Sequence, residues 1–123
     1  MAWNNPERRQ FVRVNFPCRI VLHKPQEHII STKVKDVSTG GIRIVIAEKL
    51  ETSSLVNLTI YGLAKRPITC RGRIKWAFSR KNSKDNNSYL FDTGIEFHKI
   101  NDQDLKKIKS IVALKLSDSR EYD

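Results

Sequence analysis

The chain has 123 residues, of which 39% are hydrophobic and 29% are charged, so it has room for one domain with a buried core and is not a disordered chain. Its formal net charge of +10 points to an anionic partner, although a basic proteome or a solvated surface would give the same balance. No run of about 18 apolar residues and no apolar secretion-signal core occurs, which excludes membrane spanning and makes the cytoplasm the expected compartment.

The N-terminal segment, residues 1–15, is predicted to be a flexible arm that enters the domain. Its start shows no hydrophobic periodicity, and Asn4-Asn5-Pro6 is typical of a turn. The arm holds three guanidiniums, on Arg8, Arg9 and Arg13. Each guanidinium is a planar, permanently charged fork of donors. It suits bidentate contacts with phosphate oxygens or with the Hoogsteen edge of guanine.

Residues 16–117 are predicted to form the folded domain, which begins with six strands. Apolar and polar residues alternate there with the period of two that half-buried strands show. The predicted strands are residues 16–22, 28–37, 42–46, 55–61, 68–78 and 89–98. The two cysteines, Cys18 and Cys70, fall in phase with the apolar positions. We expect them to be buried free thiols rather than a disulfide.

The segment 68–78 has the clearest alternation, and a cationic stripe follows its polar face. The stripe consists of Arg71, Arg73 and Lys75. A solvated strand face is the ordinary explanation for the stripe, and docking of an acidic partner is the alternative. Trp76 and Phe78 share the face of Ile74 and are therefore predicted to belong to the core. Residues 79–88 are predicted to form a polar, basic and flexible hairpin loop.

A single helix is predicted over residues 101–117, followed by a disordered tail over residues 118–123. Asn101 can cap the first turn, where Asp102 and Asp104 favour the positive end of the helix dipole. The apolar face of this helix consists of Leu105, Ile108, Val112 and Leu116. Six short strands followed by one helix favour a mainly β fold, a small six-stranded antiparallel barrel, over alternating β/α units.

The run Asp36-Val37-Ser38-Thr39-Gly40-Gly41 stands between two predicted strands, and its groups suit a guanine nucleotide. Asp36 can accept hydrogen bonds from the ring and amino N–H groups of guanine, and Ser38 can serve a base or a phosphate. Gly40 and Gly41 let the backbone approach a ligand where a Cβ would collide. The same run is also ordinary turn chemistry, in which Asp and Ser bond the local backbone and Gly accepts a positive φ.

The order and spacing of these residues resemble the two-part signature of PilZ domains, the bacterial receptors for cyclic di-GMP. The two parts are Arg9-x-x-x-Arg13 and Asp36-x-Ser38-x-x-Gly41. The segments 72–76 and 94–97 are also similar to two paired strands of that family, the second being its closing strand. The resemblance covers most of the chain, and it implies that the predicted barrel is closed.

The resemblance also implies a binding mode. Arg9 and Arg13 would reach the phosphates and the guanine Hoogsteen edges of cyclic di-GMP, while Asp36 and Ser38 would contact guanine from the rim of the barrel. In this family the residue before the first motif arginine is associated with the number of bound ligands, and Arg8 favours an intercalated pair per chain. The alternative for Arg8 is a side chain that points into solvent.

The predicted function is that of a bacterial cyclic di-GMP receptor. Its arm would fold onto the ligand, and the change of conformation would signal to an unidentified downstream protein. Binding needs no catalytic group, and the three histidines show no metal-ligand spacing with the two cysteines. We therefore expect no enzymatic activity, no metal and no cofactor.

Two other functions stay open. A basic nucleic-acid-binding barrel is supported by the cationic stripe and the basic loop. A single strand, however, needs aromatic side chains beside the cations, and Trp76 and Phe78 are predicted to lie behind them, so nucleic acid is not the favoured partner. The second alternative is a PilZ-like adaptor that binds protein and no nucleotide. The intact motifs count against it.

Overall fold

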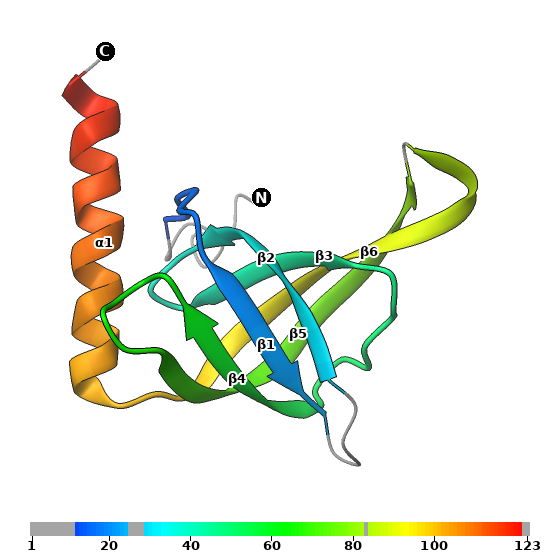
Figure 1. The fold of residues 1–123 in the computed structure, drawn as a ribbon, viewed down its shortest axis with the longest axis horizontal. Helices are drawn as coiled ribbons and strands as arrows, with labels where there is room; N and C mark the ends of the chain where they lie inside the picture. Colours follow the sequence, from blue (N-terminus) through cyan, green and yellow to red (C-terminus); the bar gives the residue numbers. More distant parts are fainter. Residues whose placement is uncertain (1–11, 25–28, 83, 122–123) are drawn as a thin grey trace, which may run out of the picture.

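Six antiparallel strands close into a barrel in the order β1-β2-β3-β6-β5-β4 in the computed structural model of the chain, which describes residues 12–24, 29–82 and 84–121 (Figure 1). The elements are β1 (Arg19–His23), β2 (Ile29–Val37), β3 (Gly41–Ile46), β4 (Leu55–Tyr61), β5 (Ile68–Asn82), β6 (Asp85–Lys99) and α1 (Asp102–Glu121). The predicted six-stranded antiparallel barrel with a C-terminal helix is confirmed. Because the last strand of the order pairs with the first, the barrel has no free edge along its length.

The inner face of the barrel is apolar because side chains alternate along each strand. In β3, for example, Ile42, Ile44 and Ile46 are buried while the residues between them are not. The same alternation buries Ile20 and Leu22 in β1. Each such side chain stabilises the fold by about 1.5–3 kcal/mol when it is fully buried. The outer face is therefore left to polar and charged residues.

A β-bulge in β5 reverses the alternation at Lys75. Ile74 pairs with Ile95 of β6 and is buried, whereas Trp76 pairs with the adjacent Gly94, which leaves Lys75 without a partner. After Lys75, the residues that strict alternation would place inside the barrel lie outside, and the reverse. Trp76 and Phe78 consequently lie on the outer face, and Phe78 is 63% exposed. The prediction that both belong to the core was wrong, because a period of two does not reveal where a strand gains a residue.

The β5–β6 hairpin replaces the predicted flexible loop over residues 79–88. β5 continues to Asn82 and β6 begins at Asp85, so that paired strands project beyond the barrel (Figure 1). The Asn82 side chain accepts a hydrogen bond from the backbone N–H of Lys84 at 3.0 Å. The prediction of a loop was wrong because it rested on polarity. Residues 79–88 contain no Pro or Gly, and a strand pair outside the core needs no apolar side chain.

The helix α1 lies beside one end of the barrel (Figure 1). As predicted, Asn101 caps its first turn, since Asn101 Oδ1 accepts from the backbone N–H of Asp104 at 2.8 Å. Ile108 and Val112 are buried against the barrel core. The helix continues to Glu121, beyond its predicted end at residue 117, and no Gly or Pro ends it sooner. No helix of the described residues has the length and apolar character needed to cross a membrane.

Both cysteines are free, as predicted. Cys18 is buried and Cys70 is half-buried. Burial raises the pKa of each thiol to about 11, and the negative charge of Asp104 adds to the effect at Cys70. Both therefore stay protonated and unreactive at neutral pH.

Gly41 is required by the packing of β3 on β6, and Gly41→Ala should lower the free energy of unfolding by at least about 2 kcal/mol in urea denaturation. A Cβ at this position would lie 2.0 Å from the backbone oxygen of Ile95, which no side-chain rotation can relieve. Gly40→Ala, in the same turn, is the matched control. Gly40 has no positive φ, so a change of less than about 1 kcal/mol is expected. Equal effects of the two substitutions would contradict this explanation.

Candidate functional site

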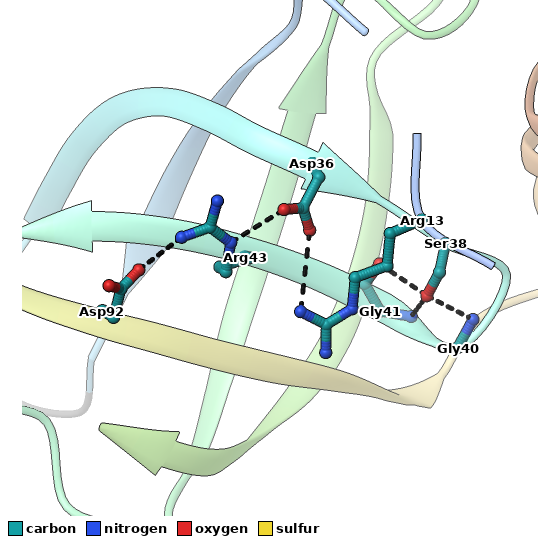
Figure 2. A network of polar contacts seen from close by, with 7 residues as sticks. All are labelled: Arg13, Asp36, Ser38, Gly40, Gly41, Arg43 and Asp92. Carbon is teal, nitrogen blue, oxygen red and sulfur yellow. Dashed lines mark hydrogen bonds and ion pairs between the residues drawn. The ribbon is translucent and has the colours of Figure 1, made fainter. Parts of the chain in front are cut away.

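The segment before β1 is held against the end of β2 by one backbone pair. The Val14 N–H donates to the Val37 carbonyl at 2.8 Å, and the Val37 N–H donates to the Val14 carbonyl at the same distance. Side chains alternate, so Val14 is buried and Arg13 lies on the outside. This pairing brings Arg13 next to Asp36 although 22 positions separate them in the sequence (Figure 2).

Arg13 contacts both a carboxylate and an aromatic ring. Its Nη1 lies 3.9 Å from Asp36 Oδ1, and its Cζ lies 5.8 Å from the centre of a Trp76 ring, within the range of a cation–π contact. The Arg13 side chain is still 51% exposed, so its remaining N–H donors face solvent. The predicted meeting of the arginine segment with the Asp36 turn is therefore present for Arg13.

Asp36 is held in place by a chain of charged groups on the outer face of four strands, β2, β3, β6 and β5. Arg43 Nε donates to Asp36 Oδ2 at 2.7 Å, and Arg43 Nη1 donates to Asp92 Oδ1 at 2.5 Å (Figure 2). Arg80 reaches the other oxygen of Asp92 at 3.3 Å. The Asp36 hydrogen bond is the main reason that the pKa of Arg43 is raised, with Asp92 adding to it. Arg43 thus fixes one oxygen of Asp36 and leaves the other oriented toward Arg13.

Ser38 and the two glycines form a tight turn. Ser38 is 6% exposed, and its hydroxyl oxygen accepts from the backbone N–H groups of Gly40 and Gly41, both at 3.1 Å (Figure 2). Neither glycine has a positive φ. The Ser38 bonds match the alternative of ordinary turn chemistry, but the positive φ that it assigns to glycine is absent here, and Asp36 accepts from Arg43. Gly41 has a packing role against Ile95. The prediction that Ser38 contacts guanine stays a prediction.

Trp76 and Phe78 form an apolar surface next to Arg13. Their rings stack with centres 5.4 Å apart and an angle of 18° between the planes. Gly94 of β6 lies directly under the indole, because a Cβ there would come within 2.3 Å of Trp76 Cε2. The strand thereby offers a flat ring surface on the outside of the barrel, on the same face as Asp36 and Arg43.

Arg8 and Arg9, the first two predicted site arginines, lie outside the described residues.

Sequence reasoning missed Arg43, Asp92 and Trp76 as members of the site. Arg43 and Asp92 alternate with buried residues on their strands, which marks them as outward-facing, but their contact depends on the register of β3 against β6. Among residues 12–24, 29–82 and 84–121, no group of three His, Cys, Asp or Glu side chains is placed to hold a metal ion.

The arrangement combines three kinds of group on one face: guanidinium donors, a fixed carboxylate acceptor and an exposed aromatic plane. Such a set suits a ligand that is planar, anionic and equipped with N–H donors. A nucleotide with a guanine base has all three properties.

The family model of the PilZ domain matches residues 7–114, which is most of the chain. The chain therefore belongs to the PilZ domain family, as the resemblance of its motifs indicated. A search among curated proteins found no match.

Three solved structures illustrate the similarity. The PilZ domain of YcgR from Escherichia coli, solved with cyclic di-GMP, is 14% identical with a TM-score of 0.71, over 94% of this chain and 96% of that one. The Bacillus subtilis inhibitor of motility MotI/DgrA is 22% identical, with a TM-score of 0.69 over 89% of this chain and 52% of MotI. K. pneumonia MrkH is 14% identical, with a TM-score of 0.77 over 99% of this chain and 53% of MrkH. The chain thus spans about half the length of MotI and of MrkH. At these identities the likeness shows the fold.

Arg43→Met should destabilise the protein by about 1–3 kcal/mol at neutral pH, because two partly buried carboxylates lose their shared charged donor. Urea denaturation monitored by circular dichroism measures the change. The control is Arg66→Met, at an exposed arginine of the loop between β4 and β5, for which less than about 0.5 kcal/mol is expected. If Arg43→Met cost no more than this control, Arg43 would not hold Asp36 and Asp92 in place.

Proposed function

We propose that this protein binds cyclic di-GMP on the outer face of the barrel, at Arg13, Asp36 and Trp76, and acts as a receptor for that second messenger. The observation that carries the proposal is the convergence of a half-exposed guanidinium, a fixed carboxylate and a half-buried indole on one outer face. Membership of the PilZ family and the YcgR domain solved with cyclic di-GMP support the choice of ligand.

Each group of the proposed site has a partner on the ligand. Arg13 would bind a phosphate oxygen or the Hoogsteen edge of a guanine, and Arg9 would do the same from the N-terminal segment. The Asp36 oxygen that faces Arg13 would accept from the guanine ring and amino N–H groups. A guanine would stack on the Trp76 ring. Ser38, Gly40 and Gly41 complete the site as the turn that bounds it.

The electrostatics suit a ligand with two phosphate charges. Each hydrogen bond to a charged group contributes about 1.5–3 kcal/mol, so several of them reach the roughly 8 kcal/mol of micromolar binding after the cost of association is subtracted. Asp36 would repel a phosphate placed against it. The phosphates therefore belong on the arginine side of the site and the guanine N–H groups on the Asp36 side.

Arg8 supports a second proposal about stoichiometry, in which two intercalated cyclic di-GMP molecules bind per chain. A third guanidinium next to Arg9 would stack on the exposed guanine of the second molecule or bind its phosphate.

The protein would not catalyse a reaction on the ligand. It would act in the cytoplasm, and the ordered complex with the ligand would form the surface that a downstream protein contacts.

Binding of a single-stranded nucleic acid is the second candidate, and one observation favours it. The argument against it was that Trp76 and Phe78 lie in the core, and instead they lie outside, close to Arg13 and on the same strand as Arg80. Stacking residues beside cations are what a single strand requires. The carboxylates Asp36 and Asp92 at the centre of the face count against a polyanion.

Isothermal titration calorimetry with cyclic di-GMP should show saturation at two molecules per chain. Arg9→Ala and Arg13→Ala should each weaken binding by about 10- to 100-fold, because each removes a charged donor. GMP and GTP serve as ligand controls, and Arg66→Ala, at an exposed arginine away from the site, should bind as wild type does. Saturation at one molecule would reject the intercalated pair. Tighter binding of an oligo-dT strand, with a steep salt dependence, would favour the nucleic-acid candidate instead.

Hydrogen exchange provides the test of the N-terminal arm. If residues 5–14 fold onto the ligand, their amide exchange should slow when cyclic di-GMP is added to saturation, while exchange in β1 and β4 stays unchanged. The measurement is exchange followed by mass spectrometry on the full chain. Unchanged exchange in residues 5–14 at saturating ligand would remove the arm from the mechanism and leave Arg13 and Asp36 as a preformed site.

A further inference from the structure

A second charged surface lies across the barrel from the nucleotide site. In the barrel order, β1 is opposite β6 and β4 is opposite β3 (Figure 1). The outer faces of β1 and β4 therefore point away from those of β3 and β6, the strands that hold Arg43 and Asp92. We call this surface the basic barrel face. It spans β2, β1, β4 and β5 and is formed by the outward residues Arg19, Lys33, Leu55, Tyr61, Arg71 and Arg73, with Lys99 of β6 at its edge.

Like charges stand directly opposite each other on this face. Arg19 of β1 pairs with Lys33 of β2, and Arg71 of β5 pairs with Lys99 of β6. Directly opposed like charges destabilise a sheet. None of these four cations forms an ion pair with a carboxylate of the described residues. The barrel therefore carries an electrostatic cost here that its own described side chains do not offset.

The strands that form the face contain almost no acidic residues. β1, β4 and β5 have neither Asp nor Glu, and β2 has only Asp36, which faces the nucleotide site beyond its bulge. The carboxylate at the border is Glu96, opposite Arg73, and Lys75 is paired with it at 3.7 Å. Apart from Glu96 and Asp104 of α1, whose charge reaches Cys70, the charges over the face are positive, and this excess favours an anionic partner.

The face also carries exposed apolar and aromatic groups among its cations. Tyr61 is 46% exposed and lies directly opposite Arg19, and Leu55 is 37% exposed and lies opposite Arg73. Tyr and Arg are the residues most enriched at the centres of protein interfaces, where Lys is depleted. The two Arg–apolar pairs lie at opposite ends of β4, six residues or about 20 Å apart, so each can contact a different part of one extended segment.

We propose that the basic barrel face is a docking surface for an acidic segment of a partner protein. Arg71 and Arg73 are two residues apart on one strand, a spacing of about 6.7 Å. An extended peptide with a carboxylate at every second residue repeats at the same distance, so consecutive acidic side chains can meet both guanidiniums. A single nucleic-acid strand fits less well, since it needs several aromatic rings and Tyr61 is the one exposed ring among the described residues of this face.

The proposed docking surface is a different site from the proposed nucleotide site, and each proposal can be tested without the other. It shares no residue with the site around Arg13 and Asp36. An acidic partner could therefore occupy β1 and β4 whether or not a nucleotide is bound on the far side of the barrel.

The test is nuclear magnetic resonance of the full chain, labelled with nitrogen-15 and titrated with a short poly-L-glutamate peptide. Amide shifts should concentrate in β1, β4 and the first half of β5. In the face variant, Arg19→Gln, Lys33→Gln and Arg71→Gln are combined. The helix variant combines Lys106→Gln, Lys107→Gln and Lys109→Gln, three exposed positions of α1. Each variant lowers the net charge by three, from +10 to +7.

The face variant should lose about tenfold or more in affinity for the peptide, and the helix variant should lose less than about threefold. Both should bind cyclic di-GMP as wild type does, which separates this result from the outcome at the nucleotide site. Equal losses in the two variants, or shifts centred on α1 or the β5–β6 hairpin, would overturn the proposal. So would an oligo-dT strand of the same charge that binds the face more tightly than the peptide.

Discussion

The register of β3 against β6 is the constraint on which the candidate site depends. Gly41 lies under the Ile95 carbonyl, and this contact leaves no room for any other residue at that position. With that pair fixed, Arg43 is opposite Gly94 and within reach of Asp92. The Trp76 indole packs directly on the backbone of Gly94, which has no side chain. A shift of one residue between β3 and β6 would separate Arg43 from Asp92, because it would turn the side chains of β3 to the other face.

Much of the fold followed from the sequence because alternation is a local property. Ile42, Ile44 and Ile46 alternate with polar or half-buried neighbours, and they are buried as predicted. The cap at Asn101 is equally local and was also correct. The motif residues Arg13 and Asp36 were expected to meet, and they do. Burial and capping require only the order of residues along one segment, whereas the meeting of Arg13 with Asp36 was expected from the resemblance of the two motifs to the PilZ signature.

The errors all involve relations between segments. The extra residue at Lys75 is visible only when β5 is aligned with β6, and it carries Trp76 and Phe78 from the expected core to the outer face. The bond between Arg43 and Asp92 joins residues 49 positions apart, so no local sequence pattern predicts it. The extension of the hairpin depends on pairing of polar strands with each other, for which composition gives no signal. Local chemistry predicted the parts of the site, and register decided which parts meet.

The bulge at Lys75 also bears on how such barrels diverge. Relatives with 14% identity keep the fold, so side-chain substitution alone has left the architecture intact. Chain length acts differently: one residue inserted in β6 between Gly94 and Ile95, opposite Lys75, would restore strict alternation and turn the indole of Trp76 toward the hydrophobic interior. A single codon gained, with no change in any other amino acid, would then convert a barrel with an external aromatic platform into one without it. Barrels with and without this platform can thus be neighbours in mutational space.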